Sequence, residues 1–264
     1  MLLEDKVVLI SGIGPGLGVK LAVEAAREGA SAVIVSARTA AKLDDAESRI
    51  KALGTHCKVL KKATDIKDAA QCKALVDAGV KAFGRIDALV NSAFEHGPLD
   101  FVSSANLEGW LTGPIGTNLL GTLKLTQAVI PAMKAQGGGA IVMINTMAVR
   151  KVPPLGEAGY AASKAALAAT VKYLAKEVGP HKIRVNTVHM GWMWGAPVQG
   201  YLQWQAQQQK KSLQEMLDQV AANIPLGRIP PDEECARAAL FMVSDYASVV
   251  TGASLDVNGG EYMP

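Results

Sequence analysis

Tyr160 and Lys164 are four positions apart in the alanine-rich stretch Tyr160-Ala-Ala-Ser-Lys164. In a helix this spacing places both side chains on the same face. A free tyrosine titrates at about 10, which makes it a poor proton carrier at neutral pH. An ammonium group about 4 Å away, at an effective dielectric constant of about 20, favours the phenolate by about 4 kcal/mol before desolvation is subtracted. The pair therefore predicts a tyrosine that acts as a general acid or base, although the same spacing also arises by chance in a chain of this length.

A glycine-rich segment, Ser11-Gly12-Ile-Gly14-Pro15-Gly16-Leu17-Gly18, directly follows the apolar run Val7–Ile10. Glycines permit a tight turn from strand to helix and let a pyrophosphate approach the backbone, where the N–H groups at the helix start attract its charge. Because the chain has 26 glycines, the spacing alone is weak evidence. Its position immediately after the first strand-like run favours phosphate binding over a purely structural turn. We therefore expect a nucleotide cofactor to contact Ser11, Gly12, Gly14, Pro15, Gly16, Leu17 and Gly18.

The end of the second strand-like run predicts which nucleotide is bound. An acidic residue at this point would hold the ribose 2′-hydroxyl of NAD, but the run ends Val35-Ser-Ala-Arg38-Thr39 and the next carboxylate is Asp44. Arg38 can form bidentate hydrogen bonds to a 2′-phosphate, and Thr39 can add a hydroxyl. These residues favour NADP(H) over NAD(H). The alternative is an Arg38 that stacks on adenine while NAD is used.

These groups need a scaffold, and the chain alternates short apolar runs with helix-like stretches. The predicted strands are Val7–Ile10, Ala32–Val35, Lys58–Leu60, Ala88–Val90, Ala140–Ile144, Ile183–Val188 and Ser254–Val257. The predicted helices are Leu17–Glu28, Ala40–Leu53, Lys67–Phe83, a long segment from Ala105 to Met133, and Tyr160–Val178. The strands are almost continuously apolar, as in a parallel sheet covered on both faces. The pattern predicts an α/β fold with a single Rossmann-type, doubly wound domain over residues 1–264 and about seven parallel strands.

Two segments depart from this alternation. Thr112-Gly-Pro-Ile-Gly116 lies inside the long helical segment, where a proline and two glycines are expected to kink or interrupt the helix. Residues 191–225 contain proline, glycine and many glutamines, but some of their apolar residues keep helical spacing. We expect a loop with one or two short helices over 191–225, and long excursions of this kind are often functional lids.

The composition excludes several classes of protein. The 27 basic and 24 acidic residues give a net charge of only +3, which is too small and too dispersed for a nucleic-acid surface. The three cysteines, Cys57, Cys72 and Cys235, have no C-x-x-C spacing, which argues against a disulfide framework or a zinc site. The chain also lacks a recognisable signal peptide and a stretch of about 20 apolar residues. We expect a cytoplasmic protein with no metal, membrane or nucleic-acid partner.

Taken in order, the motifs resemble the short-chain dehydrogenase/reductase family, in its single-domain branch with a Tyr-x-x-x-Lys active site, over essentially the whole chain. The matching segments are Ser11-Gly-x-x-x-Gly16-x-Gly18, Thr64-Asp65-Ile66, Asn91-Ser92-Ala93, Thr117-Asn118-Leu-Leu-Gly121, Tyr160/Lys164 and a tail running from Leu226-Gly-Arg through Thr251-Gly to Asn258-Gly-Gly260. The resemblance implies that Asn118, Tyr160 and Lys164 are catalytic. It also implies that the cofactor is contacted by Asp65, Ile66, Asn91, Ser92, Ala93 and the catalytic pair itself, Tyr160 and Lys164.

The catalytic serine of the family is one departure. It usually stands about 13 residues before the tyrosine, a position that Met147 occupies here. The simplest explanation is one extra residue in Met147–Gly159, with the hydroxyl supplied by Thr146 at the end of the fifth strand. Threonine keeps the hydroxyl but has a stiffer χ1. The alternative is that Thr146 is an ordinary threonine at a strand end.

Two further departures flank the expected site. Met190-Gly191 replaces the usual Pro-Gly, and Gly195 stands where a cofactor-binding threonine is common. Met193 then fills the position whose backbone holds the nicotinamide carboxamide in the family. Thr112–Gly116 comes just before Asn118, so a broken helix there would displace the asparagine, whereas a tolerated kink would not.

The resemblance implies hydride transfer between a nicotinamide and a carbonyl or secondary alcohol. Tyr160 would protonate the carbonyl oxygen, which Thr146 would orient. Lys164 would bind the ribose and lower the pKa of the tyrosine, and Asn118 would connect a water chain to bulk solvent. The protein is then expected to be a short-chain alcohol dehydrogenase or ketoreductase.

Clustered aromatic residues near the end of the sixth strand suggest the substrate. We expect an apolar cyclic or aromatic ketone, because ligands of open α/β sheets bind at this edge. The candidate substrate residues are Phe94, His96, Met147, Trp192, Trp194, Tyr201 and Trp204. The alternative is that Trp192 and Trp204 are core or subunit contacts. His96 and His189 are expected to be ordinary polar residues rather than catalytic bases.

Other functions of this fold compete with the oxidoreductase. A regulatory relative that binds NADP(H) and catalyses weakly is expected to lose the tyrosine–lysine pair, which is intact here. Relatives that dehalogenate halohydrins fill the nucleotide site with side chains, whereas Gly12, Gly16 and Gly18 keep it open. Relatives that reduce enoyl groups usually space the tyrosine and lysine more widely. The resemblance also implies a homo-oligomer, a tetramer or a dimer, with the apolar tail Tyr262-Met-Pro264 at an interface or frayed.

Overall fold

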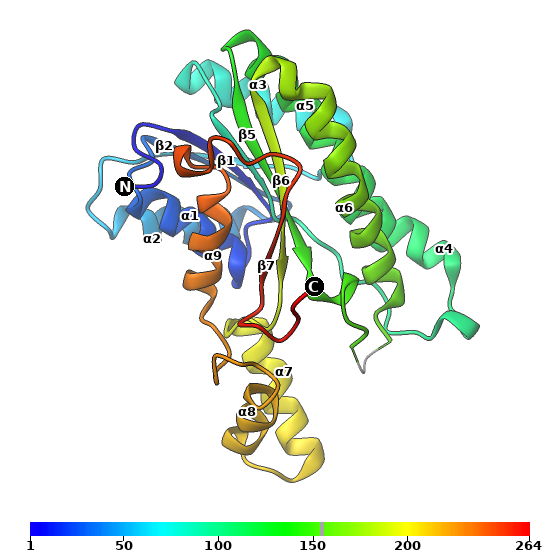
Figure 1. Cartoon of the computed structure of the whole chain (residues 1–264). Coiled ribbons are helices and arrows are strands. Elements are labelled where there is room, and N and C mark those ends of the chain that lie inside the picture. The colour runs from blue at the N-terminus through cyan, green and yellow to red at the C-terminus, as the bar shows by residue number, and fades with distance from the viewer. Residues whose placement is uncertain (154–155) are drawn as a thin grey trace.

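A computed structural model describes residues 1–153 and 156–264 of the chain. Its centre is a seven-stranded sheet in which every neighbouring pair of strands is parallel (Figure 1). The strands are β1 (Val7–Ser11), β2 (Ala32–Ala37), β3 (Lys58–Ala63), β4 (Ala88–Asn91), β5 (Gly139–Thr146), β6 (Ile183–Met190) and β7 (Ser254–Val257). The spatial order is β3-β2-β1-β4-β5-β6-β7. The order therefore reverses between β1 and β4, which is where open α/β sheets bind ligands.

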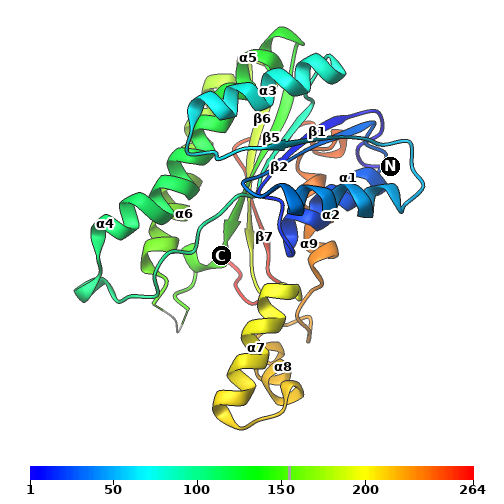
Figure 2. The same ribbon diagram turned by 180° about the vertical axis from the view of Figure 1, so that it is seen from behind.

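Helices cover both faces of the sheet, as predicted for a doubly wound domain (Figures 1 and 2). One face is covered by α1 (Leu17–Arg27), α2 (Ala40–Lys51) and α9 (Asp232–Phe241). The other is covered by α3 (Ala69–Phe83), α5 (Thr122–Ala135) and α6 (Ala158–Val178). The sequence patterns indicated all of these helices except α9. Short 3₁₀ turns occur at η1 (Val102–Ser104), η3 (Met147–Val149), η4 (Gly179–His181) and η5 (Asp245–Ala247).

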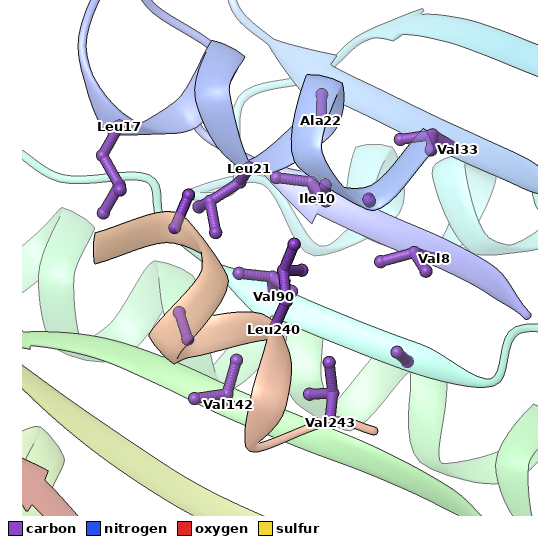
Figure 3. Close-up of a cluster of buried hydrophobic side chains, with 14 of the residues drawn as sticks. Val8, Ile10, Leu17, Leu21, Ala22, Val33, Val90, Val142, Leu240 and Val243 are labelled. Atoms are coloured by element: carbon purple, nitrogen blue, oxygen red, sulfur yellow. The ribbon is translucent and has the colours of Figure 1, made fainter. Parts of the chain in front are cut away.

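The core explains why the strands are almost continuously apolar. Val8 and Ile10 of β1 belong to the buried cluster beneath α1 and α9, whereas Val7 and Leu9 of the same strand belong to the cluster beneath α3, α5 and α6. Figure 3 shows the first cluster, in which Leu240 of α9 lies against the sheet. Both faces of the strand are thus removed from water, so neither face can be polar.

The segment Thr112–Gly116 widens its helix and does not break it. The chain is helical from α4 (Leu107–Trp110) through a π-helix, η2 (Leu111–Gly121), into α5. In a π-helix each N–H reaches the carbonyl five residues back. A Cβ placed on Gly121 would lie 3.3 Å from the Gly116 carbonyl oxygen, which shows how closely these wide turns bring the backbone together. The expected interruption is therefore absent from this segment, and Asn118 lies within the wide turns.

Residues 191–225 contain two helices, as expected, and these project from one end of the sheet (Figures 1 and 2). They are α7 (Ala196–Gln209) and α8 (Leu213–Ala221). A capping box between Ser212 and Glu215 begins α8, because the serine side chain accepts a backbone N–H and the glutamate returns the interaction. Among the residues described, no helix combines the length and apolar character required to cross a membrane.

Candidate active site

A cleft of about 550 Å³ opens at the carboxyl ends of the strands, over the point where the strand order reverses. It brings together most of the residues predicted for catalysis and cofactor binding. Those that line it are Gly12, Gly14, Pro15, Gly16, Leu17, Gly18, Arg38, Thr39, Asp65, Ile66, Ser92, Ala93, Thr146, Tyr160, Lys164 and Met193. These residues come from seven different parts of the chain, so the parallel sheet is what gathers them.

The glycine-rich turn forms one wall of the cleft and fits a nucleotide pyrophosphate. A Cβ on Gly12, whose φ is +82°, would overlap the backbone of Ala93, and a Cβ on Gly18 would overlap the carbonyl oxygen of Gly12. The turn can therefore close only without side chains at these two positions. Gly16 is the N-cap of α1, and this helix start has no side-chain cap and no acidic residue in its first turn. Its N-terminus is thus electrostatically suited to an anion.

Basic groups line the cleft where β2 ends. Arg38 is exposed and lies on the cleft wall, and so does Lys42, one turn into α2. Asp44 is turned away, because its carboxylate accepts a hydrogen bond from the Lys61 ammonium at 2.7 Å. The sequence patterns indicated Arg38 and Thr39 but not Lys42. Lys42 follows Arg38 by four residues, and this spacing would place both side chains on the same side of the start of α2. Among the described residues at this wall, Arg38 and Lys42 are thus two cations that can attract a negatively charged group on the ribose of a bound nucleotide.

Tyr160 and Lys164 both face the cleft from the first turns of α6, and Thr146 faces it from the end of β5. Burial raises the pKa of the Tyr160 phenol, and a hydrogen bond with the Thr146 side chain opposes that shift. The Lys164 side chain is only 2% exposed, and its Nζ donates a hydrogen bond to the Ile144 carbonyl oxygen at 2.7 Å. Burial lowers the pKa of Lys164 to about 7. The amino group of Lys164 is therefore held by the backbone of β5, and burial is the largest effect on the pKa of Tyr160.

Asn118 does not line the cleft but is fully buried behind it. Its Oδ1 accepts the backbone N–H of Glu95 at 2.7 Å, and its Nδ2 donates to the Glu95 carbonyl oxygen at 2.9 Å. The same Nδ2 lies 2.9 Å from the Ser163 hydroxyl, which donates to the Tyr160 carbonyl oxygen at 2.7 Å. Asn118 therefore connects the loop after β4 to the turn of α6 that carries the tyrosine.

Two rings from the loop after β4 contact Tyr160. The imidazole of His96 is stacked on the phenol ring, with 5.0 Å between centroids and 18° between planes. Phe94 meets the same ring edge-on at 6.2 Å, and it also lines the cleft. Both residues were predicted to contact the substrate, and for Phe94, which lines the cleft, this stays a prediction. His96 itself, however, is packed on the tyrosine and does not line the cleft.

The other predicted substrate residues do not line the cleft, and the expectation that they form its wall is wrong for this structure. Trp192, Trp194 and Tyr201 pack into a separate hydrophobic cluster with buried side chains of α7 and α8. Trp192 and Tyr201 are stacked at 6.2 Å, while Trp204 is 53% exposed on the outer side of α7. Met147 lies in η3, outside the cleft lining. The aromatic cluster forms because α7 folds back on α8, so the core-contact alternative describes Trp192 but not the exposed Trp204.

Ser11 and Asn91 lie at the ends of β1 and β4 beneath the cleft and are buried. Asn91 donates from Nδ2 to the Thr126 hydroxyl at 3.1 Å, which ties β4 to α5. Within the described part of the chain, the Ser11 hydroxyl and the Asn91 Oδ1 have no hydrogen-bond partner. Neither residue lines the cleft. The extra residue that we expect in Met147–Gly159 falls in a segment whose residues 154–155 lie outside the described residues.

Asp232 is a residue of the cleft that the sequence patterns did not indicate. It is 2% exposed, and burial raises the pKa of its carboxyl group. Its Oδ2 occupies the space that a Cβ on Gly195 would fill, and it has no hydrogen-bond partner among the described residues. Gly195, one of the departures noted above, therefore leaves the space that the Asp232 carboxyl group occupies. No local signal in the sequence links two residues so far apart.

Metal-binding residues are not concentrated in the cleft or elsewhere in residues 1–153 and 156–264, where no group of three or more His, Cys, Asp or Glu side chains is placed to hold an ion. The polar side chains that line the cleft are hydroxyls, an amide, cations and the carboxyl groups of Asp65 and Asp232. Such a set suits a phosphorylated nucleotide and a carbonyl oxygen.

Known proteins share both the sequence and this architecture. Residues 12–261 match the family model described as enoyl-(acyl carrier protein) reductase. The chain is 34% identical over 260 residues to the 3-oxoacyl-[acyl-carrier-protein] reductase FabG of Thermotoga maritima, covering 98% of this chain and 99% of the relative. It is 32% identical over 268 residues to a 3alpha-hydroxysteroid dehydrogenase of Mediterraneibacter gnavus, covering 98% of each. The solved structure of L-sorbose reductase from Gluconobacter frateurii, complexed with NADPH and L-sorbose, matches with a TM-score of 0.91 at 28% identity, covering 99% of this chain and 98% of that one. The strand order, the glycine-rich turn and the Tyr160–Lys164 pair agree with these similarities, and the chain belongs to the short-chain dehydrogenase/reductase family.

Proposed function

We propose that this chain is an NADP(H)-dependent oxidoreductase that interconverts a ketone and a secondary alcohol. The observation that carries the proposal is that Thr146, Tyr160 and Lys164 line the same cleft as the glycine-rich turn. A proton donor, a hydroxyl and a cation thus stand beside a site for a pyrophosphate. This combination serves a carbonyl that is reduced next to a bound dinucleotide.

Each group has a distinct role in the reductive direction. A nicotinamide cofactor, when bound, supplies the hydride. The Tyr160 phenol donates the proton to the carbonyl oxygen, which the Thr146 hydroxyl orients by a hydrogen bond. Lys164 would hold the ribose hydroxyls, and its charge favours the phenolate once the proton has left. Asn118 keeps the loop after β4 against the tyrosine through its hydrogen bonds to Glu95.

The preference for NADP(H) is supported by the charge at the end of β2. Arg38 and Lys42 line the cleft there, while Asp44 pairs with Lys61 and leaves this wall without a carboxylate for a 2′-hydroxyl. Two cations on one wall attract a 2′-phosphate, and the guanidinium can bind it with two parallel hydrogen bonds.

The substrate that we propose is an apolar cyclic or aromatic ketone. Its support now comes from Phe94, Met193 and Val198, which line the cleft, because the tryptophans of the 191–225 segment pack elsewhere. The names of the relatives above refer to a 3-oxoacyl-[acyl-carrier-protein], a 3alpha-hydroxysteroid and L-sorbose. A ring-bearing apolar ketone fits the side chains that are present here.

A panel of ketones, secondary alcohols and α,β-unsaturated ketones, each assayed with NADPH and NADH at the nicotinamide absorbance, tests the proposal. We expect faster oxidation of NADPH than of NADH, with cyclic or aryl ketones as the best substrates. Reduction of a carbon–carbon double bond with the ketone left intact would instead identify an enoyl reductase. Tight NADPH binding with no turnover of any carbonyl would identify a regulatory relative.

A further inference from the structure

His96 and Glu157 form a polar pair against the face of Tyr160. The His96 Nε2 lies 3.2 Å from Glu157 Oε1, and the imidazole is stacked on the phenol at 5.0 Å. Glu157 precedes Tyr160 by three residues and lies at the start of α6, and its backbone is bridged to that of Asp100. The histidine thus touches the proton-carrying ring on one side and a carboxylate on the other.

The geometry points to a role for this pair in the chemistry of the tyrosine: we propose that His96, as an imidazolium paired with Glu157, is a positioning residue that holds the Tyr160 ring and favours its phenolate. The inference rests on the proposed function, because it assigns Tyr160 the proton transfer. His96 does not line the cleft, so it acts through the tyrosine and not on the substrate.

The charges around His96 support its protonated form. The carboxylate of Glu157 raises the pKa of His96, and this effect exceeds the opposing effect of burial. The neighbouring acids are engaged elsewhere: Glu95 accepts from the Thr117 hydroxyl at 2.7 Å, and Asp100 accepts from the Trp110 indole at 2.9 Å. Lys164 is held at the Ile144 carbonyl. Glu157 is therefore the charged partner of the imidazole.

The two charges have opposite effects on the phenol. An imidazolium over the face of an aromatic ring is attracted to it, and more strongly when the ring carries a negative charge. The carboxylate of Glu157 by itself raises the pKa of Tyr160. The His96 imidazolium therefore offsets the Glu157 carboxylate, which disfavours the Tyr160 phenolate, and its own positive charge favours that phenolate. Without His96 the carboxylate would act on the tyrosine unopposed.

The first experiment is independent of turnover. The chain has four histidines, whose ring protons are followed by NMR as the pH is changed, with His96→Gln identifying the His96 signal. We expect the pKa of His96 to lie above its ordinary value in the wild type and to fall in Glu157→Gln, because the carboxylate that raises it is gone. A His96 that titrates at its ordinary value, unchanged by Glu157→Gln, would overturn the proposal.

The second experiment follows alcohol oxidation with NADP⁺, in which the phenolate accepts the proton. The pKa read from the pH profile of kcat/KM should rise by about one unit in His96→Gln, so that kcat/KM below it falls about tenfold. The double variant His96→Gln/Glu157→Gln should recover most of that shift, because it removes the carboxylate as well. His181→Gln is the matched control, since this histidine is exposed at η4. Thermal unfolding checks that each variant is folded.

The outcomes separate a charge effect from a packing effect. If His96 only fills space, the pKa from the kcat/KM profile will be as high in the double variant as in His96→Gln, and the proposal is overturned. An unchanged profile in His96→Gln overturns it as well. A wild-type protein that oxidises no alcohol refutes the proposed function, and the NMR titration then still decides whether the pair exists.

Discussion

Asn118 holds Glu95 by both backbone groups, accepting from its N–H at 2.7 Å and donating to its carbonyl oxygen at 2.9 Å. Glu95 stands between Phe94 and His96, the two residues whose rings contact Tyr160. The asparagine therefore sets the position of Tyr160 indirectly, by fixing the loop beside it. The wide turns of η2 carry Asn118 into that position.

Asn118→Ala should destabilise the protein and impair catalysis together. It leaves the two backbone groups of the half-buried Glu95 without their partner, which costs roughly 2–6 kcal/mol for two such groups. Urea unfolding measures this loss, and kcat should fall as the loop leaves Tyr160. The matched control is Asn223→Ala, because Asn223 is exposed and bonds only to the nearby Gln219 carbonyl oxygen. Equal stability of the two variants would contradict the role given to Asn118.

Tyr160→Phe should lower kcat by about 10²–10⁴-fold, the usual contribution of a positioned proton donor. The phenylalanine keeps the ring that Phe94 and His96 contact, so the affinity for NADPH should change less than about twofold. Steady-state kinetics and NADPH fluorescence measure the two effects. Tyr173→Phe on the same helix serves as the control, since its side chain is 73% exposed. Undiminished turnover in Tyr160→Phe would remove the tyrosine from the mechanism.

Arg38→Ala and Lys42→Ala should each weaken NADPH binding while leaving NADH binding almost unchanged. A hydrogen bond to a charged group contributes about 1.5–3 kcal/mol, so the Kd for NADPH should rise roughly 10- to 100-fold in Arg38→Ala. Arg49→Ala is the control on the same helix, because Arg49 pairs with Asp45 on the exposed surface. If the ratio of the NADPH affinity to the NADH affinity is the same in both variants as in the wild type, Arg38 and Lys42 do not select the cofactor.

His189 should make the protein less stable in mild acid. It is 1% exposed on β6, and burial lowers its pKa to about 4 from an ordinary value of 6.5. The unfolded chain therefore binds a proton between these values that the folded chain does not, so stability is intact above about pH 6.5 and is lost as the pH falls towards 4. When the pH is lowered from 7.5 to 5, His189 therefore reduces the free energy of unfolding by about 2 kcal/mol.

Urea unfolding at the two pH values tests this effect of His189. The acid-induced loss of stability should be smaller by about 2 kcal/mol in His189→Gln than in the wild type. His181→Gln, at an exposed position, should behave like the wild type. A His189→Gln variant with the same pH dependence as the wild type would show that His189 is protonated in the folded state.

The sheet and most of the cleft were predictable because their signals are local. Apolar runs of β-branched residues mark strands buried on both faces, and all seven predicted runs are strands here. The spacing of Tyr160 and Lys164 likewise fixes their common face on α6. Such patterns need only a few consecutive residues, so one sequence suffices.

The remaining features depend on contacts between distant segments. The stacking of His96 on Tyr160 joins residues 64 positions apart, and the carboxyl group of Asp232 occupies the space left by Gly195. The tryptophans after β6 could line a pocket or pack in a core, and this depends on how α7 meets α8. Helix α9 begins with three acidic residues and buries mostly small side chains, so its apolar pattern is weak.

The separate hydrophobic cluster of α7 and α8 has an evolutionary consequence. Leu202, Ala206 and Met216 are buried within this pair of helices, apart from the clusters on the two faces of the sheet. Substitutions that reshape the pair therefore leave the packing of the sheet intact. The fold can diversify at this end by exchanging α7 and α8, while the sheet and the cleft residues that it carries stay in place.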